Sequence, residues 1–106
     1  MKILFDREEE FINSPCRQPT TMRLKSAAAH DGTLIAREVS VTCDSGAYVS
    51  WGSVTPIVMV HTFSSIYRVP NVRFYAEAVY TNNPITGSFR GFGNPEITFA
   101  IESHMD

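Results

Sequence analysis

The clearest pattern in the chain is an alternation of apolar and polar residues on both sides of Asp31-Gly32, which predicts a β-hairpin. Asp-Gly is a favoured two-residue hairpin loop, because both of its positions take positive φ angles. The predicted register pairs Met22 with Val41, Arg23 with Ser40, Leu24 with Val39, Lys25 with Glu38, Ala28 with Ile35 and Ala29 with Leu34. A shift of one residue would set Lys25 against Val39, so the pattern favours this register.

Weaker patterns predict three more elements in the first two thirds of the chain. Lys2–Phe5 is rich in Ile, Leu and Phe, which is typical of a short strand. Asp6 and Glu9 have the spacing of a capping box, so a short helix is expected over about Asp6–Ile12. Val54–Phe63 has helical spacing of apolar residues but also contains a proline and β-branched residues. It is interpreted as a helix with the proline in its first turn.

The last third alternates first and then becomes helical. Asn71–Tyr80 predicts a half-buried strand. Asn94-Pro95 predicts a helix in which Asn94 is the cap and Pro95 the first helical residue. The apolar stripe of this helix is formed by Ile97, Ala100, Ile101 and Met105. Because this stripe is still running at Asp106, we expect residues 1–106 to be a single, partial domain.

These elements predict an α+β fold, with an antiparallel hairpin and further strands packed against two or three short helices. Large apolar residues are plentiful for so few elements. We therefore expect exposed hydrophobic surface that is covered by a partner chain or by self-association.

Composition narrows the function classes. Nine basic and eleven acidic residues give a net charge of −2, with no basic stripe for nucleic acid. No apolar run is long enough for a membrane span. The two cysteines, Cys16 and Cys43, lack the partners of a metal or iron–sulfur site, and ordinary thiols in a cytoplasmic protein are the favoured interpretation. No metal site is predicted, because no histidine has a second ligand at helical spacing.

Gly87–Gly93 is the one stretch that favours chemistry. It lies between a predicted strand and a predicted helix, where loops carry binding groups on a rigid frame. Its glycines allow close approach of a ligand to the backbone, Arg90 offers a planar fork of donors for anionic oxygens, and Phe92 offers a flat face for stacking. The same residues also suit an ordinary surface turn. The stretch is neither a dinucleotide fingerprint nor a P-loop.

The order of motifs resembles the molybdenum-binding large subunits of the xanthine dehydrogenase and aldehyde oxidase family. Gly87–Glu96 is similar to the family's Gly-Ala-Phe-Arg-Gly-Phe-Gly-x-Pro-Gln motif. Further similar stretches, in the family's order, are Phe5–Phe11, Arg17–Pro19, Asp31–Leu34, Asp44–Tyr48, Tyr67–Val72, Ala78–Pro84 and Phe99–Asp106. The resemblance therefore extends over essentially the whole chain.

The resemblance implies a role for the loop in hydroxylating an aromatic heterocycle or an aldehyde. Arg90 matches a residue that contacts the molybdenum–molybdopterin cofactor, and Phe92 matches one that stacks on a planar substrate. Phe89 and Gly91 would shape the same cofactor-binding loop. Partners implied are the rest of the molybdenum subunit, and iron–sulfur and FAD domains or subunits.

The resemblance also limits the expectation. The family's glutamate base and pterin-binding glycine and glutamine loops match nothing in this chain, so no catalytic residue is assigned. Glu10, Glu38, Glu77 and Glu102 are interpreted as surface or helix-face residues. The isolated chain is expected to be inactive.

Two departures from the family pattern bear on specificity. Glu96 stands where glutamine is common, which adds a negative charge beside the loop. Pro56–Phe63 lacks the arginine of the purine-oxidising branch, which disfavours xanthine and hypoxanthine as substrates. Alternatives left open by the sequence are a non-catalytic interaction module and a small-molecule binding domain.

Overall fold

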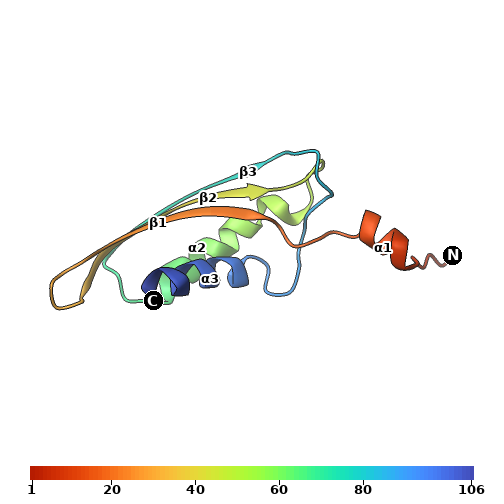
Figure 1. The fold of residues 1–106 in the computed structure, drawn as a ribbon. Coiled ribbons are helices and arrows are strands. Elements are labelled where there is room, and N and C mark those ends of the chain that lie inside the picture. Colours follow the sequence, from red (N-terminus) through yellow and green to blue (C-terminus); the bar gives the residue numbers. More distant parts are fainter.

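The computed structural model describes all residues, 1–106, as one sheet covered by helices on one face and continued by an N-terminal arm (Figure 1). The chain is elongated, with extents of 62 × 21 × 21 Å. Its elements are α1 (Arg7–Asn13), β1 (Thr20–Ala28), β2 (Leu34–Asp44), the 3-10 helix η1 (Trp51–Ser53), α2 (Thr55–Ser65), β3 (Asn71–Val79) and α3 (Asn94–Met105). The predicted α+β class is confirmed.

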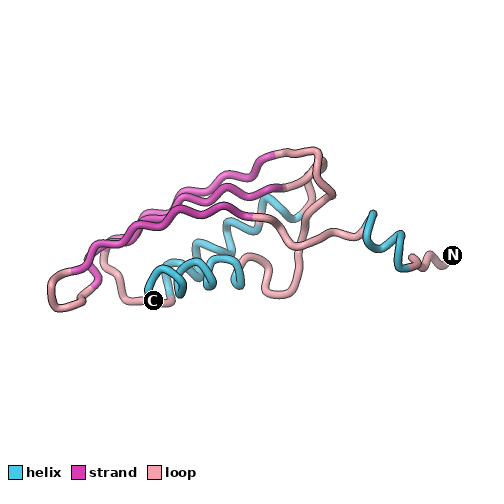
Figure 2. The backbone as a smooth tube through the Cα atoms, viewed as in Figure 1, coloured by secondary structure: helices cyan, strands magenta, loops and turns pink.

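The sheet is mixed, with strand order β1-β2-β3. β1 and β2 form the predicted antiparallel hairpin, and β3 returns parallel to β2 after the connection that contains α2. α2 and α3 both lie against the same face of the sheet (Figure 2). The connections from β2 to α2 and from β3 to α3 lie at the end of the sheet opposite the hairpin turn, whereas the connection from α2 to β3 lies at the hairpin end (Figure 1).

The hairpin register is confirmed from Met22 to Lys25, but the turn was predicted wrongly. Ala29 N–H bonds to the Thr33 carbonyl at 2.9 Å, so the loop has three residues, and of these only Gly32 takes a positive φ, of 86°. Ala28 pairs with Leu34, and the register shifts between residues 27 and 28. A three-residue loop that ends in a left-handed glycine is the common alternative to the two-residue turn.

The core is small and lies between the sheet and the two helices. It consists of Val39, Val41, Cys43, Met59, Phe63, Ile97 and Ile101. Alternation along β2 directs one face of the strand into this core. Two of the four predicted stripe positions of α3, residues 97 and 101, are fully buried, whereas Met105 at the end of the helix is exposed.

The N-terminal arm stands away from the sheet (Figure 1). The predicted strand Lys2–Phe5 is wrong, because no strand lies beside it to supply hydrogen bonds. The capping box is confirmed: the Asp6 carboxylate accepts from the Glu9 N–H at 2.9 Å, and the Glu9 side chain accepts from the Asp6 N–H at 3.0 Å. The arm exposes several large apolar side chains, including Leu4 and Phe11. This agrees with the predicted exposed hydrophobic surface, since the core is too small to bury all the large apolar residues.

The later helices differ from the prediction mainly at their ends. α2 begins one residue later than predicted and ends at Ser65, with Pro56 in its first turn as expected. In α3 the cap is Gly93, not Asn94, which already lies in the first turn. The Asn94 side chain instead accepts a hydrogen bond from the Thr62 hydroxyl of α2. No helix is long and apolar enough to cross a membrane.

The two cysteines differ enough in environment to be told apart chemically. Cys16 is exposed and Cys43 is buried. Burial, followed by the negative charge of Glu96, raises the pKa of the Cys43 thiol to about 11. At pH 8 only about 0.1% of such a thiol is ionised. A disulfide reagent is therefore expected to modify one thiol per native chain and two in urea. Two thiols of equal reactivity in the native chain would contradict this burial.

Candidate functional site

Three chain segments meet at the end of the sheet and fix the start of the loop Gly87–Gly93. Cys16 N–H bonds to the Ile85 carbonyl at 3.3 Å, and Gly87 N–H bonds to the Cys16 carbonyl at 3.1 Å. On the other side, the Ser45 carbonyl accepts from the Thr86 N–H at 3.4 Å. The segment that enters the loop is thus held from both sides by backbone.

The Asp44 carboxylate reinforces this junction at the end of β2. It accepts hydrogen bonds from the Thr81 hydroxyl at 2.6 Å, from the Gly46 N–H at 2.8 Å and from the Asn83 side chain. These donors, with the Thr81 hydroxyl first, hold the pKa of Asp44 below its usual value. An ionised carboxylate therefore ties β2 to the chain that follows β3 and leads to the loop.

The loop backbone takes an unusual shape. Gly91, Phe92 and Gly93 have φ angles of 87°, 42° and 90°, so three consecutive residues are left-handed. Phe92 is the only residue other than glycine with a positive φ in the chain. Two turn hydrogen bonds stabilise the bend, from the Phe92 N–H to the Phe89 carbonyl at 2.7 Å and from the Asn94 N–H to the Gly91 carbonyl at 3.0 Å. A non-glycine residue in this region is strained and is a feature of functional loops.

The loop presents its predicted side chains to different surroundings. Arg90 is exposed, and its guanidinium makes no hydrogen bond or ion pair within the chain. Phe89 is also exposed. Phe92 is half-buried and meets the Trp51 ring edge-on, with centroids 6.5 Å apart. Arg90 and Phe92 thus lie two positions apart on one short loop, and only the Phe92 ring is supported by η1.

A cluster around Arg17 was not predicted from the sequence. Its guanidinium pairs with Glu96 at 2.9 Å, donates to the Arg90 carbonyl at 2.9 Å and lies 4.8 Å from the Phe89 ring centroid. The charge of Glu96, which stands where the family commonly has glutamine, is thus neutralised by a cation from the other end of the chain. Local patterns give no indication of contacts between residues so far apart in sequence.

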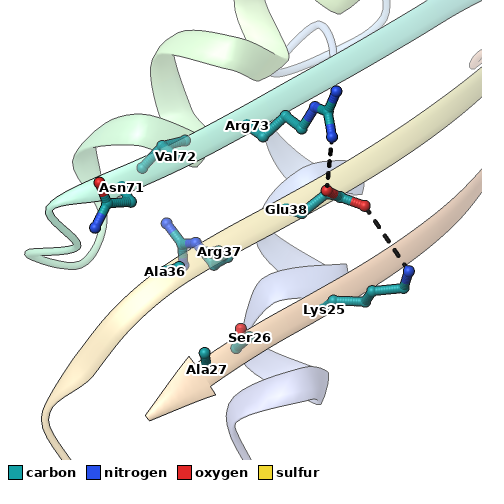
Figure 3. Close-up of a pocket in the computed structure, with 9 residues that line it drawn as sticks. All are labelled: Lys25, Ser26, Ala27, Ala36, Arg37, Glu38, Asn71, Val72 and Arg73. Atoms are coloured by element: carbon teal, nitrogen blue, oxygen red, sulfur yellow. Dashed lines mark ion pairs between the residues drawn. The ribbon is translucent and has the colours of Figure 1, made fainter.

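A hollow lies away from the loop, on the sheet face opposite the helices (Figure 3). It measures about 340 Å³ and is lined by residues of all three strands. Its centre is Glu38, which pairs with Arg73 at 3.5 Å and with Lys25 at 3.9 Å. Because Glu38 lies between both cations, these side chains form an ordinary charged sheet surface.

Glu77 and Glu102 also have ordinary hydrogen-bond partners. Glu77 accepts from the Thr42 hydroxyl at 3.0 Å, and Glu102 accepts from the Tyr67 hydroxyl at 3.0 Å. The one cation of the core, the Arg37 guanidinium, lies 4.4 Å from the Phe63 ring centroid. No group of three His, Cys, Asp or Glu side chains is arranged to hold a metal ion.

Comparison with known proteins identifies the fold that carries this loop. The whole chain, residues 1–106, matches the sequence profile of the molybdopterin cofactor-binding domain. The chain belongs to this family. It is 44% identical over 107 residues to the nicotinate dehydrogenase large molybdopterin subunit of Eubacterium barkeri. It is 39% identical over 106 residues to a probable xanthine dehydrogenase subunit of Bacillus subtilis.

A solved structure of this family agrees with the fold. The aldehyde oxidoreductase from Desulfovibrio gigas superimposes with a TM-score of 0.85 over 91% of this chain, at 31% identity. The chain spans 14% of the Bacillus relative, 25% of the Eubacterium relative and 11% of the Desulfovibrio structure. The chain therefore has the molybdopterin-binding fold but corresponds to only a small part of each relative's length.

Proposed function

We propose that this chain supplies one wall of the cofactor and substrate site of a molybdenum hydroxylase. The observation that carries the proposal is the strained, glycine-flanked loop with a free guanidinium at Arg90 and an aromatic ring at Phe92. In this assignment Arg90, Phe89 and Gly91 face the cofactor, and Phe92 faces the substrate. The alternative of a non-catalytic binding module has no observation in its favour.

The donor groups of the loop suit an anionic, oxygen-rich group such as molybdopterin. The backbone N–H groups of residues 88–91 donate no hydrogen bond within the chain. Arg90 adds a permanent cation with no acidic partner. Consecutive free N–H groups beside an arginine favour binding of anionic oxygens. When bound, the molybdenum cofactor would supply a two-electron oxidation in which the added oxygen comes from water.

Phe92 supports a planar substrate, either an aromatic heterocycle or an aldehyde. Its backbone strain and its edge contact with Trp51 restrict the orientation of the ring. A ring held in one orientation loses little entropy when a flat molecule stacks on it. Names of the relatives agree with such substrates, since they include a nicotinate dehydrogenase and an aldehyde oxidoreductase.

The proposal includes partners that complete the site. They are the rest of a molybdenum subunit, together with iron–sulfur and FAD domains or subunits, in the cytoplasm. Residues 1–106 would form a single, partial domain of that assembly. The exposed apolar side chains of the arm would be covered by such partners. In their absence the chain would cover them by self-association.

Replacing Phe92 in the complete enzyme that contains this chain tests the proposal. Phe92→Ala is expected to raise KM for planar substrates and to lower kcat, with kcat/KM falling by roughly 10- to 100-fold, because an unstacked substrate is misplaced. Steady-state kinetics and molybdenum content would be measured together. Phe99→Ala, which removes an exposed ring on α3, is the control. Unchanged kinetics in a fully molybdenum-loaded Phe92→Ala enzyme would remove Phe92 from the site.

A further inference from the structure

The contacts of Arg17 point to a role that neither the loop motif nor the family match assigns. We propose that Arg17 is a positioning residue that holds the loop Gly87–Gly93 in the shape that presents Arg90 and Phe92. This inference rests on the proposed function for its purpose, but its geometry can be tested without cofactor or substrate. Arg17 precedes β1 and lies far from the loop in sequence.

The loop does not fix its own shape. Its three left-handed residues include Phe92, whose φ of 42° is sparsely populated for any residue with a side chain. Only two turn hydrogen bonds act within the bend. Strained backbone persists only when surrounding groups over-determine it. An anchor from outside the loop is therefore required.

Arg17 supplies that anchor through two nitrogens of its guanidinium. Nη2 donates to the Arg90 carbonyl at 2.9 Å, and Nη1 pairs with Glu96 at 2.9 Å. These contacts bracket the left-handed residues, because Arg90 lies just before them and Glu96 lies in the first turn of α3. One planar, charged group thus fixes the distance between the two ends of the bend.

The surroundings of Arg17 favour arginine over lysine at this position. The guanidinium lies 4.8 Å from the Phe89 ring centroid, and at the same time its two terminal nitrogens donate to Glu96 and to the Arg90 carbonyl. A lysine ammonium is a point charge and cannot serve both oxygens in the fixed geometry of the fork. The Glu96 side chain is only 12% exposed, so loss of Arg17 would also leave a nearly buried carboxylate without its cation.

Trp51 provides a reporter for the shape of the loop. It is the only tryptophan of the chain, and its ring lies edge-on to Phe92 with centroids 6.5 Å apart. If Arg17 positions the loop, its removal separates Phe92 from Trp51 even when the sheet remains folded. Because Trp51 is itself 61% exposed, its acrylamide quenching and emission maximum are compared with those of Phe92→Ala to measure this separation, and circular dichroism measures the fold.

The test compares Arg17→Met and Arg17→Lys with Arg23→Met, an exposed arginine of β1 that forms no ion pair. Loss of two charge-assisted hydrogen bonds is expected to shift the ratio of ordered to displaced loop by roughly tenfold or more in Arg17→Met. Quenching of Trp51 should rise to the level of a Phe92→Ala calibrator. Arg17→Lys should lie between, and Arg23→Met should equal wild type.

Native quenching of Trp51 in a folded Arg17→Met chain would overturn the proposal, whatever the change in stability. If Arg17→Met does not fold, Arg17→Lys and Glu96→Ala carry the same test, and wild-type quenching in both would overturn it. In the complete enzyme, Arg17→Met should reduce kcat/KM less in a Phe92→Ala background than in wild type. Full activity of Phe92→Ala alone would instead refute the proposed function and leave the positioning role of Arg17 intact.

Discussion

Gly46→Ala is expected to destabilise the chain by about 2–5 kcal/mol, because it combines a strained backbone with a collision against backbone. Gly46 has a φ of 72°, and an added Cβ would lie 2.3 Å from the Pro84 carbonyl oxygen. A carbonyl oxygen cannot rotate away as the end of a side chain can. The segment that leads into the loop would therefore have to move. The midpoint of urea unfolding, followed by circular dichroism, measures the loss.

Gly32→Ala is the matched control for Gly46→Ala. Gly32 has a similar φ of 86°, but an added Cβ would meet nothing within 4 Å. This variant should cost only the backbone strain, about 1–2 kcal/mol. The difference between the two variants then isolates the collision with residue 84. Equal losses of stability in the two variants would mean that the backbone at residue 84 moves away easily, contrary to the close packing of residue 46 against it.

The sequence predicted the parts of the fold that local patterns control. The register of the hairpin followed from matching apolar and charged faces, since a shift by one residue would have set Lys25 against Val39. The capping box at Asp6 followed from spacing alone. The prediction failed where tertiary context decides. Lys2–Phe5 has strand composition but no neighbouring strand, and Asn94 bonds to Thr62 of α2 instead of capping its own helix.

The candidate site shows the same division. The glycines and the arginine of the loop were visible as a motif, and the structure places them on a strained bend. The anchor of this bend was not visible in the sequence, because Arg17 and the loop are far apart along the chain and meet only in the fold. Glu96 requires a cation because its carboxylate is nearly buried, but this burial is visible only in the fold. Only the fold could identify which arginine supplies it.

The core that supports the site depends on one aromatic ring. Phe63→Ala is expected to cost about 3–5 kcal/mol, because it removes a fully buried ring and leaves a cavity. The ring also covers the buried Arg37 guanidinium, 4.4 Å from its centroid, and packs on Phe74 at 5.8 Å. Without the ring, a buried cation with two unbonded nitrogens would lose the nearer of its two aromatic contacts.

Phe99→Ala is the control for this loss. Phe99 is 75% exposed on α3, so its removal should change stability by no more than about 0.5 kcal/mol. Small domains have about 5–15 kcal/mol of total stability, so Phe63→Ala should remove a large share of it. Unfolding in urea would measure both variants under one set of conditions. A loss below about 1 kcal/mol for Phe63→Ala, the cost of a conservative core change, would show that the helices are not held to the sheet through this ring. Loop and sheet would then be coupled mainly through the junction of residues 16, 45 and 86.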